Sequence, residues 1–188
     1  CGWDFSPVYA GVAWCTTDAS GQLQSLKSQL FTNHGADAIV RKVIEMTNEW
    51  FPGSSRYDYC DPAAWDRSPT DLSTCVDKMS EMGLSPMSGA HLWTERRDTM
   101  KDLLGRNHGS RPAFCVSKDP GNEWIDRGFA GRYFYPRTKM GSIIRDGPSK
   151  TEASHPMNAL EYLVTGHLTS SASRLAPKRP KKLALSYA

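Results

Sequence analysis

Hydrophobic residues change their spacing along the chain after Phe31. Apolar residues dominate positions 9–15, and leucines recur through a second extended stretch that ends at Phe31. Short turns separate these stretches from each other and from residues 2–5 in front of them, which predicts three antiparallel strands. From 36 to 51 the apolar residues instead recur every three or four positions, which predicts a helix.

The remaining segments alternate between strand and helix patterns. Residues 56–60 and 112–116 predict two short strands. Helix start and stop signals, with Ser68 and Ser154 as expected caps, predict four further helices: 68–83, 92–104, 119–128 and 154–166. A hairpin is expected around Met140-Gly141, with arms at 133–135 and 142–144. This order is typical of an RNase H-like (RuvC/integrase-like) α/β fold, with a mixed central sheet flanked by helices and a β-hairpin insertion.

The length of 188 residues fits one domain. We expect that domain to cover residues 1–168. A Ser/Pro/Lys/Arg-rich, basic and flexible tail is expected over 169–188. No run approaches the ~20 apolar residues needed to cross a bilayer, so no membrane span is expected. The chain begins without an initiator Met or a signal-peptide pattern, and we expect it to begin inside a longer protein.

Cysteine content and charge refine this picture modestly. None of the five cysteines sits in a Cys-x-x-Cys pair, so we expect reduced, mostly buried thiols in a cytosolic protein, and Cys60 in the core. Residues 1–95 carry 6 Lys/Arg and 12 Asp/Glu, whereas residues 96–145 carry 11 and 5. Such asymmetry suits a protein that gathers cations beside phosphates, but charge alone favours two differently solvated faces.

Four polar residues stand where they can meet at one edge of the sheet. Asp4 lies in the first predicted strand, and Asp61 ends the fourth. If those strands are neighbours, their carboxylates form the oxygen-rich corner that Mg²⁺ or Mn²⁺ prefers. His155 and Asn158 share one face of the last helix and can point towards these acids. Position alone favours a simpler interpretation, with a surface acid, a turn before Pro62 and an exposed histidine.

Together these segments resemble the C-terminal nuclease domain of the large terminase subunit of tailed bacteriophages and herpesviruses. The resemblance runs from about residue 1 to 166 and rests on these segments: Gly2-Trp3-Asp4-Phe5, Asp61-Pro62-Ala63-Ala64 with Arg67-Ser68 and Thr70-Asp71, Arg132-Tyr133-Phe134, and Ser154-His155-Pro156 with Ala159-Leu160 and Tyr162. It implies an RNase H-like fold and a metal-dependent endonuclease that cuts concatemeric genomes during packaging, in the host cytoplasm during viral assembly.

The resemblance also implies roles for single residues. Asp4 and Asp61 would be two of three metal-binding acids, with Asn158 in the place of the third. His155 matches a histidine found beside the site in some members. The implied cofactors are two Mg²⁺ or Mn²⁺ ions, bridged by Asp4 at ~4 Å from each other, for two-metal phosphodiester hydrolysis.

Asn158 departs from the family pattern. An amide offers a neutral oxygen where a carboxylate offers full charge, so weaker metal binding and slower cutting are expected. Either this is an Asp→Asn change that silences the nuclease, or the natural protein tolerates Asn here. Glu152 or Glu161 can substitute in principle, although Glu161 is expected to point partly away.

Basic residues are the candidates for holding double-stranded DNA by its phosphates. They lie on one predicted helix and around the hairpin: Arg96, Arg97, Lys101, Arg137, Lys139 and Arg145. Each is explained about equally well as a solvated surface residue, as is the basic run at 178–182. The chain has no P-loop, so ATP binding is not expected. The resemblance implies a preceding ATPase domain, a portal and a small terminase subunit as partners, and a monomeric isolated domain.

Two other functions remain open. The domain can act as a DNA-binding and docking module of the packaging motor with a weak or inactive nuclease site, which metal-dependent cleavage would distinguish. It can also be a junction resolvase or transposase, which a preference for branched DNA would favour. The segment 154–162 makes this last function less attractive.

Overall fold

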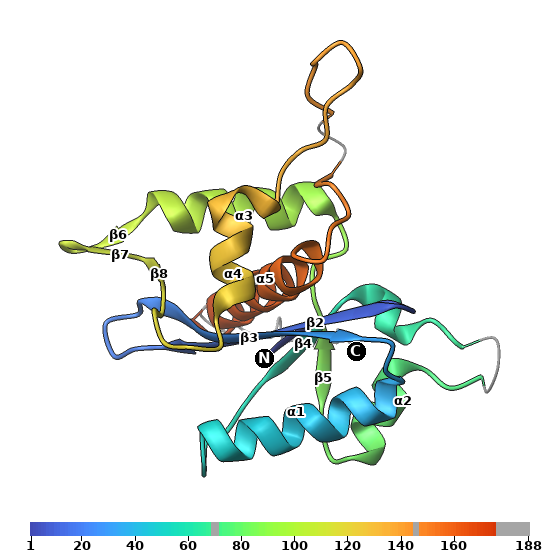
Figure 1. Cartoon of the computed structure of the whole chain (residues 1–188). Helices are drawn as coiled ribbons and strands as arrows, with labels where there is room; N and C mark the ends of the chain where they lie inside the picture. Colours follow the sequence, from blue (N-terminus) through green and yellow to red (C-terminus); the bar gives the residue numbers. More distant parts are fainter. Residues whose placement is uncertain (69–71, 145–146, 176–188) are drawn as a thin grey trace, which may run out of the picture.

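A six-stranded mixed sheet forms the centre of the molecule. The computed structural model describes residues 1–68, 72–144 and 147–175. The strand order is β5-β4-β1-β2-β3-β8 (Figure 1). The first three strands form the expected antiparallel meander: β1 (Gly2–Phe5), β2 (Tyr9–Thr17) and β3 (Leu23–Thr32). The other strands run parallel to their neighbours: β4 (Asp58–Cys60) beside β1, β5 (Pro86–Ser88) beside β4, and β8 (Phe114–Val116) beside β3.

Helices lie on both faces of this sheet (Figure 1). One face carries α1 (Ala36–Trp50) and α2 (Cys75–Glu81). On the other face α5 (Ser154–Leu175) and α4 (Glu123–Arg127) pack on the strands, and α3 (Trp93–Gly105) packs on α5. Three short elements complete the fold: the turn η1 (Pro62–Trp65), the π-helical turn η2 (Gly128–Arg132) and the ribbon of β6 (Asn107–His108) with β7 (Arg111–Pro112). Among the described residues, no helix is long and apolar enough to span a membrane.

The hydrophobic core consists of two clusters, one on each face of the sheet, because successive strand residues point to opposite faces. Trp3 and Val12 face α1 and α2, where they pack with Val43 and other buried side chains. Tyr59 packs with Leu160 in the second cluster, beneath α5. Since successive strand residues point to opposite faces, the neighbours of Trp3 in β1 face α5. Those neighbours are Gly2 and Asp4.

The backbone of α5 lies in direct contact with the backbone of the sheet. A Cβ at Gly2 would lie 1.9 Å from the Ala159 carbonyl oxygen, and one at Gly11 would lie 2.1 Å from the His155 carbonyl carbon. No real side chain tolerates such distances. The two glycines therefore allow the first turns of α5 to lie against β1 and β2, and Gly11 is the cross-strand partner of Asp4.

Three helix boundaries differ from the sequence prediction, and one of them is the start of α4, which lies at Glu123 instead of the predicted 119. α2 begins at Cys75, because Thr74 and Asp77 form a reciprocal capping box and the left-handed Leu72, with φ 58°, cannot continue a helix. The predicted cap at Ser68 is therefore wrong, and residues 69–71 lie outside the described part of the chain. The predicted end at Gly166 is also wrong, since α5 continues to Leu175.

Gly166 was misinterpreted because a glycine can serve packing as well as helix termination. A Cβ at this position would lie 2.2 Å from the Tyr59 ring. The missing side chain therefore lets α5 pass over β4. Residues 176–188, with the basic run at 178–182, lie outside the described residues.

The hairpin insertion is present, but its first arm lies three residues later in the chain than predicted. The Thr138 amide donates to the Ser142 carbonyl and the Ile144 amide to the Pro136 carbonyl, both at 2.8 Å. The arms are therefore 136–138 and 142–144, and they project from the body of the molecule beyond α3 (Figure 1). Tyr133, predicted to lie in an arm, instead returns towards α5.

The five cysteines are unpaired thiols. Cys60 is fully buried in the core, as predicted, and burial raises its pKa well above the ordinary value. The other four are half-buried, so the expectation of mostly buried cysteines is wrong.

We predict that Gly11→Ala destabilises the fold by roughly 1–3 kcal/mol or more, because the added methyl overlaps the backbone of α5. Urea unfolding followed by circular dichroism measures this change. Gly105→Ala is the matched control, since a Cβ there meets nothing within 4 Å. The control should keep or slightly raise stability. Equal stability of the two variants would contradict the close contact.

Candidate metal centre

Asp4 lies in β1, and Asp61 directly follows the neighbouring parallel strand β4. β1 and β4 pair Trp3 with Cys60, and the Asp61 amide donates to the Trp3 carbonyl at 3.0 Å. Continuing this register sets Asp61 beside Asp4, and paired residues of parallel strands point to the same face. Pro62 starts η1, and Asp61 Oδ1 accepts a hydrogen bond from the Ala63 amide at 3.0 Å. The sheet thus places both carboxylates at one edge.

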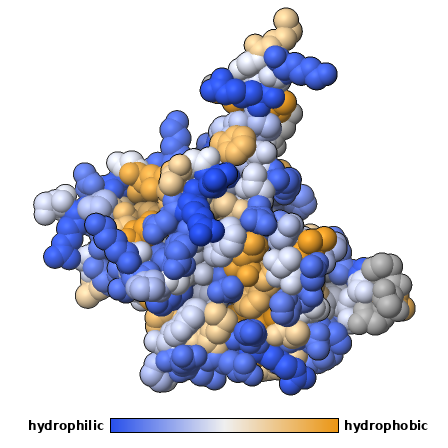
Figure 2. Space-filling model, viewed as in Figure 1, coloured by the Kyte–Doolittle hydropathy of each residue, from blue (hydrophilic) through white to orange (hydrophobic). Residues whose placement is uncertain are grey.

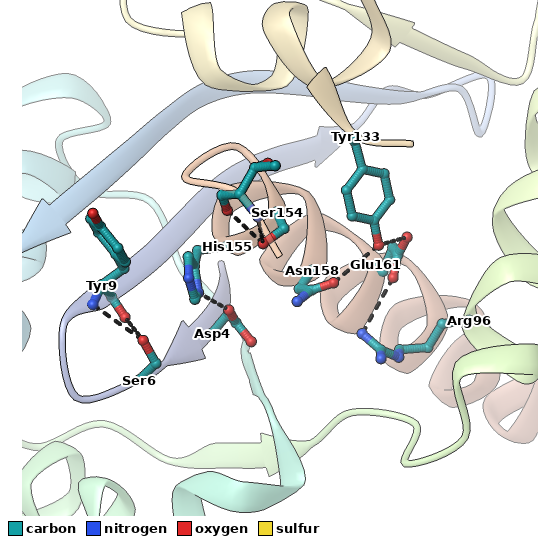
Figure 3. A network of polar contacts seen from close by, with 10 residues as sticks. Asp4, Ser6, Tyr9, Arg96, Tyr133, Ser154, His155, Asn158 and Glu161 are labelled. Carbon is teal, nitrogen blue, oxygen red and sulfur yellow. Dashed lines mark hydrogen bonds and ion pairs between the residues drawn. The ribbon is translucent and has the colours of Figure 1, made fainter. Parts of the chain in front are cut away.

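His155, in the first turn of α5, lies directly over Asp4. Its Nδ1 is 2.7 Å from Asp4 Oδ2, as Figure 3 shows. Asp4 is 5% exposed, and burial raises its pKa. The hydrogen bond from His155 opposes this shift, and the charge of Asp61 adds to it. Asp4 is therefore a desolvated acid whose side-chain hydrogen-bond partner is His155.

Asn158 follows His155 on the same face of α5, as predicted. The Tyr133 hydroxyl lies 3.0 Å from Asn158 Oδ1 and 2.8 Å from Glu161 Oε1 (Figure 3). Since a tyrosine hydroxyl carries one proton, these two oxygens share a single donor. Burial and the neighbouring Glu161 raise the pKa of Tyr133, which keeps it neutral. Glu161 was predicted to point partly away, but it faces the same hydroxyl as Asn158.

Arg96 and Glu161 form a buried ion pair beside this network. Arg96 Nη1 lies 3.3 Å from Glu161 Oε2, and its guanidinium stacks 4.3 Å from the ring centre of Tyr162. Arg96 is 8% exposed, so its predicted place on the surface of α3 is wrong. Burial raises the pKa of Glu161 to about 7, although Arg96 and Tyr133 act in the opposite direction.

The other predicted phosphate-binding residues lie apart from Asp4. Lys101 is exposed on α3, where the half-buried Arg97 pairs with Asp98 at 2.7 Å. Arg137 and Lys139 are exposed on the hairpin, and Arg145 lies outside the described residues. No hydrogen bond or ion pair joins the four described residues, Arg97, Lys101, Arg137 and Lys139, to Asp4 or Asp61, and DNA binding by all five stays a prediction.

Sequence reasoning missed Lys150 altogether. The charge of Lys150 lowers the pKa of both Asp4 and Glu161, although burial and nearer groups have larger effects on these two pKa values. It also missed the joint role of Arg96, Tyr133 and Glu161, because 65 positions separate Arg96 from Glu161.

The donor atoms fit a hard divalent ion incompletely. Asp4 and Asp61 supply carboxylate oxygens and Asn158 a neutral amide oxygen, all of the type that Mg²⁺ and Mn²⁺ accept. Within the described residues, however, no group of three or more His, Cys, Asp or Glu side chains is arranged to hold a metal. Glu161 does not complete the set, because Arg96 and Tyr133 engage its carboxylate. The residues fit a centre of two acids and one amide.

Comparisons with known proteins identify the fold. No family model and no curated protein matches the chain. The nuclease domain of the large terminase of bacteriophage SPP1, solved with bound Mn, superposes with a TM-score of 0.58 at 14% identity, over 86% of this chain and 81% of that one. The large terminase nuclease domain of P22 gives 0.58 at 12% identity, over 88% and 79%. The chain therefore has the RNase H-like fold of terminase nuclease domains, as its sequence indicated.

Because the pKa of Glu161 rises from 4.5 to about 7 on folding, the folded state binds this proton more tightly than the unfolded state. The contribution of the Glu161 proton to the free energy of unfolding is therefore fully present below pH 4.5. It is lost as the pH rises through about 7. We predict that the metal-free protein loses roughly 3 kcal/mol more unfolding free energy between pH 5 and 8 than Glu161→Gln does.

Urea titrations in EDTA at several pH values measure this difference. The exposed Glu152→Gln is the matched control and should keep the pH profile of the unmodified chain. Parallel profiles for Glu161→Gln and the unmodified chain would show that Glu161 titrates normally.

Proposed function

We propose that this domain is a metal-dependent DNA endonuclease of the terminase type, which cuts concatemeric DNA during viral genome packaging. The observation that carries the proposal is the pairing of Asp4 and Asp61 on adjacent parallel strands, with His155 over Asp4. The fold it shares with two terminase nuclease domains, one solved with bound Mn, adds support. The host cytoplasm and a motor with an ATPase domain, portal and small subunit belong to the same proposal.

Each side chain of the candidate centre has its own role in phosphodiester hydrolysis. Divalent ions, when bound, supply an activated water and neutralise charge at the leaving oxygen. Asp4 and Asp61 hold such ions through carboxylate oxygens, and Asn158 contributes a neutral one. His155 Nδ1 fixes the Asp4 carboxylate, so Nε2 is the ring nitrogen that contacts water or phosphate. Lys150 supplies positive charge beside the phosphate that is cut.

Phosphate contacts outside the centre hold the DNA in this proposal. Arg97 and Lys101 on α3, and Arg137 and Lys139 on the hairpin, supply positive charge on one side of the molecule. Binding through such contacts depends strongly on salt and weakly on sequence. Arg145 remains a candidate outside the described residues.

A DNA-binding and docking module with a weak or inactive nuclease site is the second candidate. Asn158 favours it, because the centre has two carboxylates where the family pattern has three. The ion pair between Arg96 and Glu161 also favours it, since Glu161 cannot leave Arg96 without stranding a buried charge. The choice between an active nuclease and a docking module is decided by measuring DNA cleavage. It does not depend on whether Asn158 is natural or a silencing change.

We predict that Asn158→Asp cuts supercoiled plasmid in Mn²⁺ at least roughly tenfold faster than the unmodified chain, because a full charge replaces a neutral ligand. Agarose gels over a time course measure the rate. Equal cutting by both would mean that Asn158 is a sufficient ligand or a bystander. No cutting by either would favour the docking module.

Asp61→Ala, added to Asn158→Asp, should abolish cutting and leave the circular dichroism spectrum unchanged, because it removes one of three proposed metal-binding acids without disturbing the core. Asp37→Ala is the matched control, since this acid is exposed on α1 on the opposite face of the sheet. Full activity of the Asp61 variant would rule out the proposed centre.

A further inference from the structure

An aromatic hollow lies between α3 and η2, beside the candidate metal centre. Its volume is about 350 Å³, which is in the range of small-molecule sites. Five rings line it: Trp93, Phe129, Tyr133, Phe134 and Tyr135. Figure 2 shows apolar side chains gathered on the surface beside α3 and α4. We call this feature the aromatic hollow.

Two of the rings around this hollow are exposed, and the other three are half-buried and contact one another. Phe129 is 42% and Phe134 48% exposed. Trp93 lies 6.2 Å from both Tyr133 and Tyr135, at interplanar angles of 81° and 73°. Exposed aromatic side chains that gather at one place mark a binding surface. Because the three central rings brace one another, the surface is formed before a ligand arrives.

Charge determines what can enter. Arg97 and Lys101 lie at the hollow one helical turn apart on α3, whereas Glu161 contributes a carboxylate from α5. A phosphate is attracted by the two cations at the rim, whereas the Glu161 carboxylate is already paired with Arg96. A flat, uncharged ring system meets apolar walls and no repulsion. The arrangement therefore suits a nucleobase inside and its backbone phosphates outside.

The hollow and the candidate metal centre share residues. Tyr133 and Glu161 line the hollow, and the Tyr133 hydroxyl reaches Asn158 at 3.0 Å. Six residues of α5 separate Glu161 from His155, a distance of ~9 Å along the helix axis. A base in the hollow would thus belong to a nucleotide close to the phosphate held at Asp4.

We propose that the aromatic hollow is a subsite for an unstacked nucleobase of the DNA strand that is cut. This inference rests on the proposed function and adds that the substrate is locally opened DNA. Stacking of one base on aromatic rings raises affinity by roughly tenfold or more. A duplex with a short unpaired bubble should therefore bind roughly tenfold more tightly than a fully paired duplex.

Fluorescence anisotropy at low salt in EDTA, where no cutting occurs, measures both affinities. The bubble carries 2-aminopurine, whose emission should fall when the base stacks on the rings. Phe134→Ala should remove most of the preference for the bubble and of the quenching, while paired DNA binds as before. Phe134 supplies no ligand to the candidate metal centre, so the plasmid assay on Asn158→Asp, in which Phe134 is unchanged, tests the centre independently of the hollow.

A pair of lysine variants separates base stacking from phosphate attraction. Lys101→Gln should weaken binding of both DNAs several-fold without restoring the emission. Lys42→Gln, on an exposed part of α1 across the sheet, is its matched control and should change neither.

Each failure has a different meaning. Equal binding of paired and bubble DNA, or unchanged quenching in a folded Phe134→Ala variant, overturns the base subsite alone and leaves the hollow to a protein partner. Binding of neither DNA overturns the proposed function together with the subsite.

Discussion

The backbone contact between α5 and the sheet is the constraint on which the candidate site depends. Gly2 and Gly11 let the first turns of α5 lie against β1 and β2, and this sets His155 Nδ1 2.7 Å from Asp4 Oδ2. A side chain at position 11 would displace the residue that contacts the Asp4 carboxylate. The same two glycines that close the core therefore also fix the distance between a helix-borne histidine and a strand-borne acid, so stability and site geometry cannot vary independently.

Burial of acids around α5 is the second constraint. Asp4 and Glu161 are 5% and 3% exposed, and burial raises the pKa of both. His155 is the partner of Asp4 and Arg96 is the partner of Glu161, and the charge of Lys150 lowers the pKa of both acids. Desolvated carboxylates of this kind are costly for a fold and are usual where a protein binds cations or moves protons. The cost is thus better explained by a function at this edge than by stability.

The sequence predicted features that depend on local pattern. The β1–β3 meander, α1 and the placement of Asp4 in a short first strand all follow from spacing and turn residues. The end of α5 did not, because Gly166 serves contact with Tyr59, a residue distant in sequence. Arg96 likewise has the helical position of a surface residue, and its burial depends on Glu161 and Tyr162. Contacts between residues that lie far apart in the sequence leave no pattern in the local sequence.

Asn158 is best understood through Tyr133. This hydroxyl has one proton and two acceptors, Asn158 Oδ1 and Glu161 Oε1. An aspartate at 158 would make a second carboxylate compete with Glu161 for the one proton of the Tyr133 hydroxyl. It would also add a third acid close to the buried carboxylates of Asp4 and Glu161. The amide removes that repulsion and lowers the charge that attracts a metal. Stability of the metal-free fold and affinity for the ion therefore oppose each other at this position, as they often do at functional sites.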